Sequence, residues 1–301
     1  MKKFLALTMA LAMVLGLAAC GSGDNCGSGS VSGSGATSQT DGSSSQEDAS
    51  TGGETADLSD VLVEPGKLIM STNAAFPPYE MVADGEGVYQ GLEGIDVEIA
   101  MAIADKLGLE LVIDNIDFDA ALISVQENRA DVMLAGLTYN ADRDLVMDFT
   151  DPYATGVQVI IVRGGDTTIA GTNDDLQLVD ADGNVLEDIQ IGVQRGTTGE
   201  MYCQDAHGVD HVTSLDNGSL AVQALLNGQV DCVVIDNGPA QEYVEATPGL
   251  EILEGAYVIK DYCAAVDEGN TALLNAVNTA LNELIDDGTV QSIMDKYISA
   301  E

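Results

Sequence analysis

Two spacings of hydrophobic residues alternate along the chain from about residue 66. Short apolar runs, such as "KLIMSTN" ending at Asn73, are typical of buried strands. Other segments repeat apolar residues every three or four positions, as Ile95, Ile99 and Ile103 do before the chain reaches Gly108. That spacing is typical of an amphipathic helix that a glycine ends. The alternation predicts an α/β protein.

Two similar segments lie in the two halves of this region. "SVQENRADVMLAG" (124–136) aligns without gaps with "ALLNGQVDCVVID" (224–236). Each has the pattern of a helix end, a polar turn, an aspartate and a buried strand, so each half is expected to contain its own βαβ unit. Ligands of open α/β sheets bind beyond the carboxyl ends of the strands. This rule makes Gly136 and Thr138 in one half, and Asp236 in the other, candidate ligand contacts.

The length of the chain predicts the number of lobes, and its net charge excludes some classes of partner. The 301 residues can bury one large core or two moderate ones, and we expect two lobes. Only 10 Lys and Arg residues stand against 50 Asp and Glu residues, for a formal net charge of −40. This charge repels nucleic acid and anionic membrane surfaces. We therefore expect no nucleic-acid partner.

The N-terminus has the pattern of an export signal. Two lysines precede an apolar run from Phe4 to Ala18, which is shorter than the ~20 residues needed to span a bilayer. "LAAC" then ends at Cys20 and resembles the bacterial lipobox, whose cysteine becomes the lipid-modified first residue of the mature protein. The alternative is an ordinary signal peptide followed by a chance cysteine. Residues 1–20 are thus interpreted as a lipoprotein signal peptide.

The next segment, residues 21–57, consists mostly of Gly, Ser, Thr, Asp and Glu. It has too few apolar groups to offset the entropy lost on ordering, and we interpret it as a flexible tether. Export would permit disulfides, but Cys203, Cys232 and Cys263 in the folded part leave at least one cysteine unpaired. Cys232 lies in the apolar run "VDCVVID" and is interpreted as a core residue.

One arginine stands out in this acidic chain. Arg143 lies in "LAGLTYNADRDLVMDFTDPY" (134–153), where Asn140 is expected to cap a helix that begins at "ADRDLVMDF". A cation in the first turn opposes the helix dipole by about 0.3–1 kcal/mol, so local stability does not explain it. Arg143 either forms a surface ion pair with a neighbouring aspartate or, with free N–H groups of the helix start, binds a carboxylate.

The second half offers a matching feature. "IGVQRGTTGEMY" predicts a strand, a Gly-rich turn and a helix start, where N–H groups and the hydroxyls of Thr197 and Thr198 can face an anion. Asp236 follows a buried strand and either caps the helix that begins near Pro239 or binds a cation. A carboxylate clamp on one lobe and an acid on the other would together suit a free α-amino acid.

These segments, with "TNAAFPPYEM" and "GLEGIDVEIAMAIADKLG", resemble the extracytoplasmic solute-binding proteins of polar amino-acid ABC importers, over roughly residues 66–301. The resemblance implies a two-lobed α/β fold of the periplasmic-binding-protein type with a hinged cleft. Lobe 1 would comprise residues 58–155 and 264–301, and lobe 2 residues 156–263. The implied function is to bind a free L-amino acid outside the cytoplasmic membrane and deliver it to an ABC permease. The protein would act as a lipid-anchored monomer, without catalysis, cofactor or metal.

The resemblance also assigns roles to individual residues. It implies that Arg143 binds the ligand carboxylate, that Thr197 and Thr198 complete that site from the other lobe, and that Asp236 binds the α-ammonium. Contacts with the ligand are further implied for Gly136, Thr138 and two aromatic walls, Phe76 and Phe118.

Side-chain specificity is expected from two amides. Asn73 stands where several binders of basic amino acids carry an acid, and Gln194 lies near the same pocket in the family. An amide cannot neutralise a cationic head group, so we expect a neutral polar ligand, such as glutamine or a cysteine- or cystine-like compound. Cys263 departs from the glycine that is common in the family near the second crossing between lobes.

Other functions have weaker support in the sequence. The same fold resembles periplasmic dehydratases, so an enzyme remains the alternative, in which a cleft acid would be the general acid. A sensory domain would need a transmembrane helix after the lobes, which we do not expect. His207 and His211 are four residues apart but flank Gly208, and we do not expect a metal site there. "DADGN" (180–184) is interpreted as a hairpin turn rather than a calcium loop.

Overall fold

The computed structural model describes residues 57–298. The predicted signal peptide, the lipid attachment site Cys20 and nearly all of the predicted tether lie outside the described residues. Within residues 57–298, no helix is long and apolar enough to cross a membrane.

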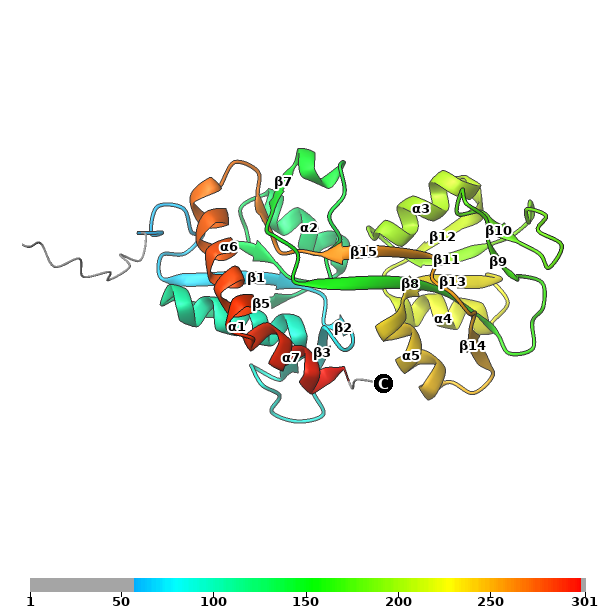
Figure 1. Ribbon diagram of the computed structural model, residues 1–301, viewed down its shortest axis with the longest axis horizontal. Coiled ribbons are helices and arrows are strands. Elements are labelled where there is room, and N and C mark those ends of the chain that lie inside the picture. The colour runs from blue at the N-terminus through cyan, green and yellow to red at the C-terminus, as the bar shows by residue number, and fades with distance from the viewer. Residues whose placement is uncertain (1–56, 299–301) are drawn as a thin grey trace, which may run out of the picture. The chain divides into compact units, whose positions relative to one another are not determined.

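The first lobe is built on a five-stranded sheet with the order β5-β1-β6-β16-β7. β5, β1 and β6 are parallel, whereas β16 at the other side of β6 is antiparallel to both of its neighbours, β6 and β7. Figure 1 shows α6 and α7 in front of β1 and α2 farther back. One apolar cluster joins α1, α6 and α7, and a separate cluster contains α2. The strands are β1 (Lys67–Thr72), β2 (Ala75–Phe76), β3 (Glu80–Val82), β4 (Leu92–Glu93), β5 (Glu110–Asn115), β6 (Val132–Met133), β7 (Met147–Phe149) and β16 (Ala265–Asp267). The helices are α1 (Ile95–Leu107), α2 (Phe118–Gln126), α6 (Thr271–Asp286) and α7 (Thr289–Tyr297).

The second lobe has a mixed sheet with the order β12-β11-β13-β8-β14, and β15 also pairs with β8. Apolar clusters lie on both of its faces, one under α4 and α5 and the other under α3. Its strands are β8 (Ala154–Arg163), β9 (Gly171–Thr172), β10 (Leu178–Val179), β11 (Ile191–Gln194), β12 (Val212–Leu215), β13 (Cys232–Asp236), β14 (Leu250–Ile252) and β15 (Val258–Tyr262). Its α-helices are α3 (Thr198–His207), α4 (Gly218–Leu226) and α5 (Asn237–Ala246), and Val209–His211 form a 3₁₀ turn.

β8 and β15 run side by side between the two lobes (Figure 1), and we call them the hinge strands. They are antiparallel, with register from Ala154↔Tyr262 to Gln158↔Val258. The predicted lobe boundaries, after residues 155 and 263, fall in and next to these strands. The boundaries themselves stay predictions.

The internal repeat has a physical basis in two equivalent aspartates. Asp131, before β6, accepts a hydrogen bond from the N–H of Ile69 in the parallel strand β1 at 2.7 Å. Asp231, before β13, accepts one from the N–H of Gln190 beside the parallel strand β11 at 2.8 Å. Each carboxylate therefore fixes the start of a buried strand against its parallel neighbour.

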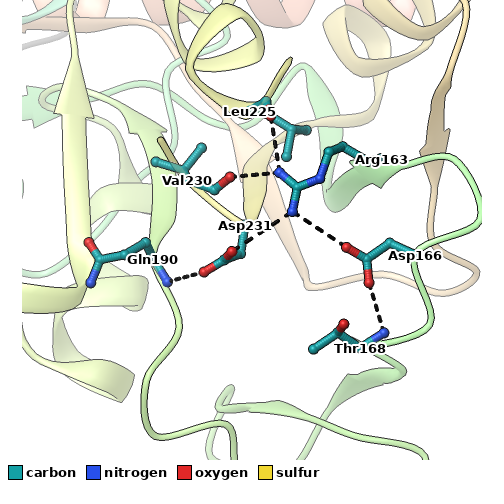
Figure 2. A network of polar contacts seen from close by, with 7 residues as sticks. All are labelled: Arg163, Asp166, Thr168, Gln190, Leu225, Val230 and Asp231. Atoms are coloured by element: carbon teal, nitrogen blue, oxygen red, sulfur yellow. Dashed lines mark hydrogen bonds and ion pairs between the residues drawn. The ribbon is translucent and has the colours of Figure 1, made fainter. Parts of the chain in front are cut away.

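Arg163 secures the same region of the second lobe (Figure 2). Its Nη1 donates to the carbonyls of Leu225 and Val230 at 3.0 and 2.9 Å, which closes the connection between α4 and β13. Its Nη2 lies 3.5 Å from a carboxylate oxygen of Asp166 and 3.8 Å from one of Asp231. These contacts join the C-terminal end of the long strand β8 to the segment that begins β13, the strand that carries Asp236.

Two sequence predictions about elements need correction. The buried strand predicted for residues 131–135 is shorter, since β6 covers only Val132–Met133. The helix predicted after Asn140 is wrong, because Arg143–Leu145 form a single 3₁₀ turn and the chain then becomes the strand β7. Pairing of β7 with β16 buries Met147 completely, and this tertiary gain overrides the local helix pattern.

Candidate functional site

All ten residues predicted to bind the ligand line one cavity. They come from both lobes: Asn73, Phe76, Phe118, Gly136, Thr138 and Arg143 from the first, and Gln194, Thr197, Thr198 and Asp236 from the second. Ala135 and Gln158 complete the lining and were not predicted. The signal for Gln158 was a single polar residue inside the apolar run "GVQVIIV" of a hinge strand.

Arg143 is buried, with 7% of its surface exposed. Its Nη1 donates to the carbonyl of Thr138 at 2.6 Å, and its Nη2 donates to the carbonyl of Gly196, on the other lobe, at 2.8 Å. The guanidinium lies 5.7 Å from the centre of the Phe118 ring. None of the ion pairs found among residues 57–298 includes Arg143. The surface ion-pair interpretation is therefore wrong.

The charge on Arg143 has an electrostatic cost. Burial lowers the pKa of its guanidinium to about 10, so it stays protonated near neutral pH. A buried charge is expensive unless a partner of opposite charge compensates it. The two hydrogen bonds to carbonyls use two of the five N–H donors that an arginine carries. The cavity therefore presents a cation that an anionic group could satisfy.

The start of α3 brings hydroxyl groups to the same end of the cavity. Thr197 caps the helix, because its Oγ1 accepts from the N–H of Glu200 at 3.3 Å. The Glu200 carboxylate returns to the N–H of Gly196 at 2.6 Å, as in a capping box. Thr198 is buried and accepts a hydrogen bond from Gln158 Nε2 at 3.2 Å, so the Thr198 hydroxyl proton is left for another acceptor.

Asp236 is the acidic residue of the cavity lining. It occupies the N-cap position of α5, but its side chain makes no capping hydrogen bond, so the capping interpretation is wrong for the carboxylate. Instead it accepts a hydrogen bond from the Tyr262 hydroxyl on the hinge strand β15. Burial raises the pKa of Asp236 to about 6, although hydrogen bonds from Tyr262 and Gln158 oppose the rise. The carboxylate is thus poised to ionise fully beside a cation.

Phe76 and Phe118 form apolar walls, with 8% and 7% of their surfaces exposed. Phe76 lies directly over Gly136, because a Cβ at Gly136 would be 2.5 Å from the ring atom Cε1. Gly136 also has φ of +50°, a conformation that favours glycine. Its N–H donates to the buried carboxylate of Asp96 at 2.8 Å. The Phe76 ring and the Gly136 backbone are therefore packed closely together at the cavity wall.

The two amides that were expected to set specificity meet across the cavity. Gln194 Nε2 donates to Asn73 Oδ1 at 3.2 Å, and Asn73 Nδ2 donates to the carbonyl of Ile116 at 2.8 Å. Arg143 and Asp236 are the charged residues in the lining. Asp117 lines a separate, open hollow next to Asn73. The cavity itself is therefore electrically balanced.

The two lobes contact each other directly around the cavity. The Arg143–Gly196 and Gln194–Asn73 hydrogen bonds both join the two lobes. At the other side of the cleft, a Cβ on Gly238 would be 2.7 Å from Cδ of Pro78. Both lobes therefore line the cavity and contact each other beside it.

The remaining candidate motifs have structural roles. His207 Nε2 accepts from the N–H of Leu178 at 2.9 Å, and His211 Nδ1 lies 3.0 Å from the carbonyl of Ile189. "DADGN" forms the expected turn, in which the Asp180 carboxylate accepts from the N–H groups of Asp182 and Asn184. The three cysteines of the described chain are free and buried: Cys203, Cys232 and Cys263.

Comparisons with known proteins agree with this architecture. The family model described as bacterial extracellular solute-binding proteins, family 3, matches residues 68–300. The L-cystine-binding protein TcyJ of Escherichia coli is 30% identical over 241 residues, which cover 79% of this chain and 85% of TcyJ.

Solved structures are similar too. A mutant of ArgBP from T. maritima has a TM-score of 0.68 and 32% identity, over 78% of this chain and 96% of that one. An ancestral arginine-binding protein bound to glutamine has a TM-score of 0.68 and 35% identity, over 78% and 99% of the two chains. The predicted resemblance to solute-binding proteins of amino-acid importers is confirmed, and this chain belongs to family 3 of the bacterial extracellular solute-binding proteins.

Proposed function

We propose that this protein binds one free L-amino acid outside the cytoplasmic membrane and delivers it to an ABC permease. The observation that carries the proposal is the buried guanidinium of Arg143, which has no carboxylate partner in the described chain and shares a cavity with Asp236. An α-amino acid carries a carboxylate that can pair with Arg143 and an ammonium group that can pair with Asp236. Its carboxylate would accept from Arg143 and Thr198, and its ammonium would donate to Asp236.

The proposed ligand has a neutral, polar side chain. Because the cavity pairs one cation with one anion, a third charge on the ligand would be desolvated without a partner. Asn73 and Gln194 offer amide groups, and Phe76 and Phe118 offer apolar walls. Glutamine fits this combination best. The ancestral arginine-binding protein that carries glutamine supports the idea that this fold can hold such a ligand.

L-Cystine is the second candidate, because the similar protein TcyJ is named for it. Cystine carries two carboxylates and two ammonium groups, whereas the cavity offers one guanidinium and one carboxylate. This mismatch in the number of charges places glutamine ahead of cystine.

A thermal-shift screen of the purified protein with the twenty amino acids and cystine tests the proposal. A ligand at 100 times its dissociation constant adds about 2.7 kcal/mol to the free energy of unfolding. We expect glutamine to give the largest shift. Absence of a shift with every compound would contradict amino-acid binding altogether.

We further propose that Cys20 carries the lipid anchor. The support is the "LAAC" sequence after an apolar run. Cys20→Ala is expected to release the protein from the membrane fraction while ligand affinity stays unchanged. A variant that remains with the membrane after a high-salt wash would place the anchor elsewhere.

A further inference from the structure

Gln158 is a buried polar residue for which the fold offers no full set of partners. It lies on the hinge strand β8, lines the ligand cavity, and has 5% of its surface exposed. Its side-chain oxygen Oε1 is buried and has no hydrogen-bond partner among residues 57–298. Buried acceptors in native proteins nearly always find a donor. The missing donor is therefore expected from a molecule that enters the cavity.

The nitrogen of the Gln158 amide, in contrast, has a hydrogen-bond partner. Nε2 donates to the hydroxyl of Thr198 at 3.2 Å. The amide also packs against the start of α3, because a Cβ on Gly199 would be 3.4 Å from Nε2 and 3.6 Å from Oε1. The amide of Gln158 is therefore held beside the first turn of α3.

Gln158 stands directly opposite Asp236. The two residues are paired in the antiparallel register of β8 and β13. Side chains of such a pair lie on one face of the sheet, with Cβ atoms about 4.5–5.5 Å apart. Asp236 Oδ1 already accepts from the Tyr262 hydroxyl. An ammonium group carries three N–H donors, so Asp236 alone cannot satisfy it.

We infer that Gln158 Oε1 accepts a hydrogen bond from the α-ammonium of the ligand, beside Asp236. This inference rests on the proposed function and adds a ligand-binding residue to the site. Through Nε2 the same side chain positions Thr198, whose free hydroxyl proton then faces the ligand carboxylate. One amide on the hinge strand thus helps to place both charged ends of the amino acid.

The decisive variant is Gln158→Met, which keeps the length of the side chain and removes both polar atoms. Gln223→Met, at an exposed position of α4, is the matched control. The probes are the twenty L-amino acids and L-cystine, followed by the 2-hydroxy analogue of the strongest binder, in which a hydroxyl replaces the ammonium.

We expect Gln158→Met to weaken binding of the amino acid about ten- to a hundredfold, as for loss of a hydrogen bond to a charged group. Binding of the hydroxy analogue should weaken by a clearly smaller factor, since the ammonium is absent. Gln223→Met should leave both affinities unchanged. The unfolding midpoint of unliganded Gln158→Met should fall only slightly, because the variant loses the hydrogen bond from Nε2 to Thr198 but none from Oε1.

Equal losses for the amino acid and its hydroxy analogue would overturn the inference, because Gln158 would then act only through Thr198. Unchanged affinity in Gln158→Met would overturn it as well. If that variant does not fold, Gln158→Glu replaces it, and an affinity loss above about a hundredfold would count against the role of the oxygen. If the wild-type protein binds none of the probes, the proposed function itself fails.

Discussion

A single buried cation, Arg143, lines the cavity of this protein. Arg143 is held between the carbonyls of Thr138 and Gly196, and no acidic side chain of residues 57–298 pairs with it. Backbone carbonyls orient the guanidinium but do not neutralise its charge. The residue is therefore placed to bind an anion rather than to stabilise the fold.

Arg143→Ala is expected to weaken ligand binding at least about thirtyfold. Removal of one partner from a buried charge pair costs about 2–5 kcal/mol, and every 1.4 kcal/mol is a factor of ten. Isothermal calorimetry with the ligand found in the screen measures the change. Arg129→Ala, an exposed arginine that pairs with Glu127, is the control and should bind normally. Near wild-type affinity in Arg143→Ala would refute the clamp.

Tyr262 lowers the pKa of Asp236 against the larger, opposite effect of burial. Its hydroxyl donates to the carboxylate, and its ring lies over Gly156 of the neighbouring hinge strand, where a Cβ would be 2.2 Å from Cζ. Tyr79 packs edge-on against it, with ring centres 5.0 Å apart. The fully buried Glu80 has a pKa well above its ordinary value, because of burial first and of Asp96 second. Burial also raises the pKa of Asp236, and the hydrogen bond from Tyr262 opposes that rise.

Tyr262→Phe is expected to shift the pH dependence of binding. Asp236 must be ionised to bind an ammonium, so affinity is complete above its pKa of about 6 in the empty site and falls as the pH drops through that value. The hydrogen bond from Tyr262 lowers this pKa. Without it the pKa rises, and the loss of affinity begins at higher pH. Dissociation constants measured across this range test the shift, and identical pH profiles for both proteins would contradict it.

The sequence analysis found both charged residues of the cavity, Arg143 and Asp236. It missed the neutral residue Gln158 and the hydrogen bond between Asn73 and Gln194. Arg143 and Asp236 attract attention because each is hard to explain locally in this chain. Gln158 was missed, since one glutamine in an apolar run has no chemical signature until the register sets it opposite Asp236. The Asn73–Gln194 hydrogen bond could not be foreseen either, because the two residues are 121 positions apart and meet only across the cavity.

At the scale of elements, the segment with strong helical periodicity, α1, formed as predicted. The helix predicted after Asn140 from its N-terminal signals did not form. α1 ends at Gly108, which has φ of 69° and accepts the left-handed conformation. The segment after Asn140 carries helix-start signals, and Asn140 Oδ1 does accept from the N–H of Arg143 at 2.8 Å. The helix nevertheless stops after one turn, because Met147–Phe149 pair with β16. Such pairing depends on residues far along the chain.

The N-terminal turn of α5 is shaped for closure of the lobes. Gly238 lies in this turn, and a Cβ there would be 2.7 Å from Cδ of Pro78 and 3.0 Å from the carbonyl of Pro77, both on the other lobe. Within a helix, alanine is up to about 1 kcal/mol more favourable than glycine. A residue that helix stability disfavours is thus explained by a contact that forms in the closed state.

Gly238→Ala should therefore affect two properties in opposite directions. The free energy of unfolding of the unliganded protein should stay equal or rise by up to about 1 kcal/mol. Ligand affinity should fall, because the added methyl group meets Pro77 and Pro78 when the lobes close. Chemical denaturation without ligand and calorimetry with ligand measure the two effects separately. An unchanged affinity would show that the lobes can close without this contact.

At the scale of the whole molecule, charge and pocket chemistry favour different ligands. The net charge of −40 attracts cationic amino acids toward the surface from a distance. The cavity, with Arg143 and Asp236 as its charged residues, favours a zwitterion with a neutral side chain. Salt separates the two effects, since the Debye length is only about 8 Å at an ionic strength of 0.15 M.

We therefore expect selectivity for the neutral ligand to emerge as ionic strength rises. Apparent affinities for arginine and lysine should fall with added salt, whereas the affinity for glutamine should change little, because the pocket contacts that hold it are buried and weakly screened. At about 0.15 M salt, glutamine should bind at least tenfold more tightly than either basic amino acid, a difference of about 1.4 kcal/mol. Competition binding at several salt concentrations measures this directly. If arginine or lysine still displaces glutamine at that ionic strength, an acid beyond Asn73, such as Asp117 in the neighbouring hollow, must reach the ligand side chain.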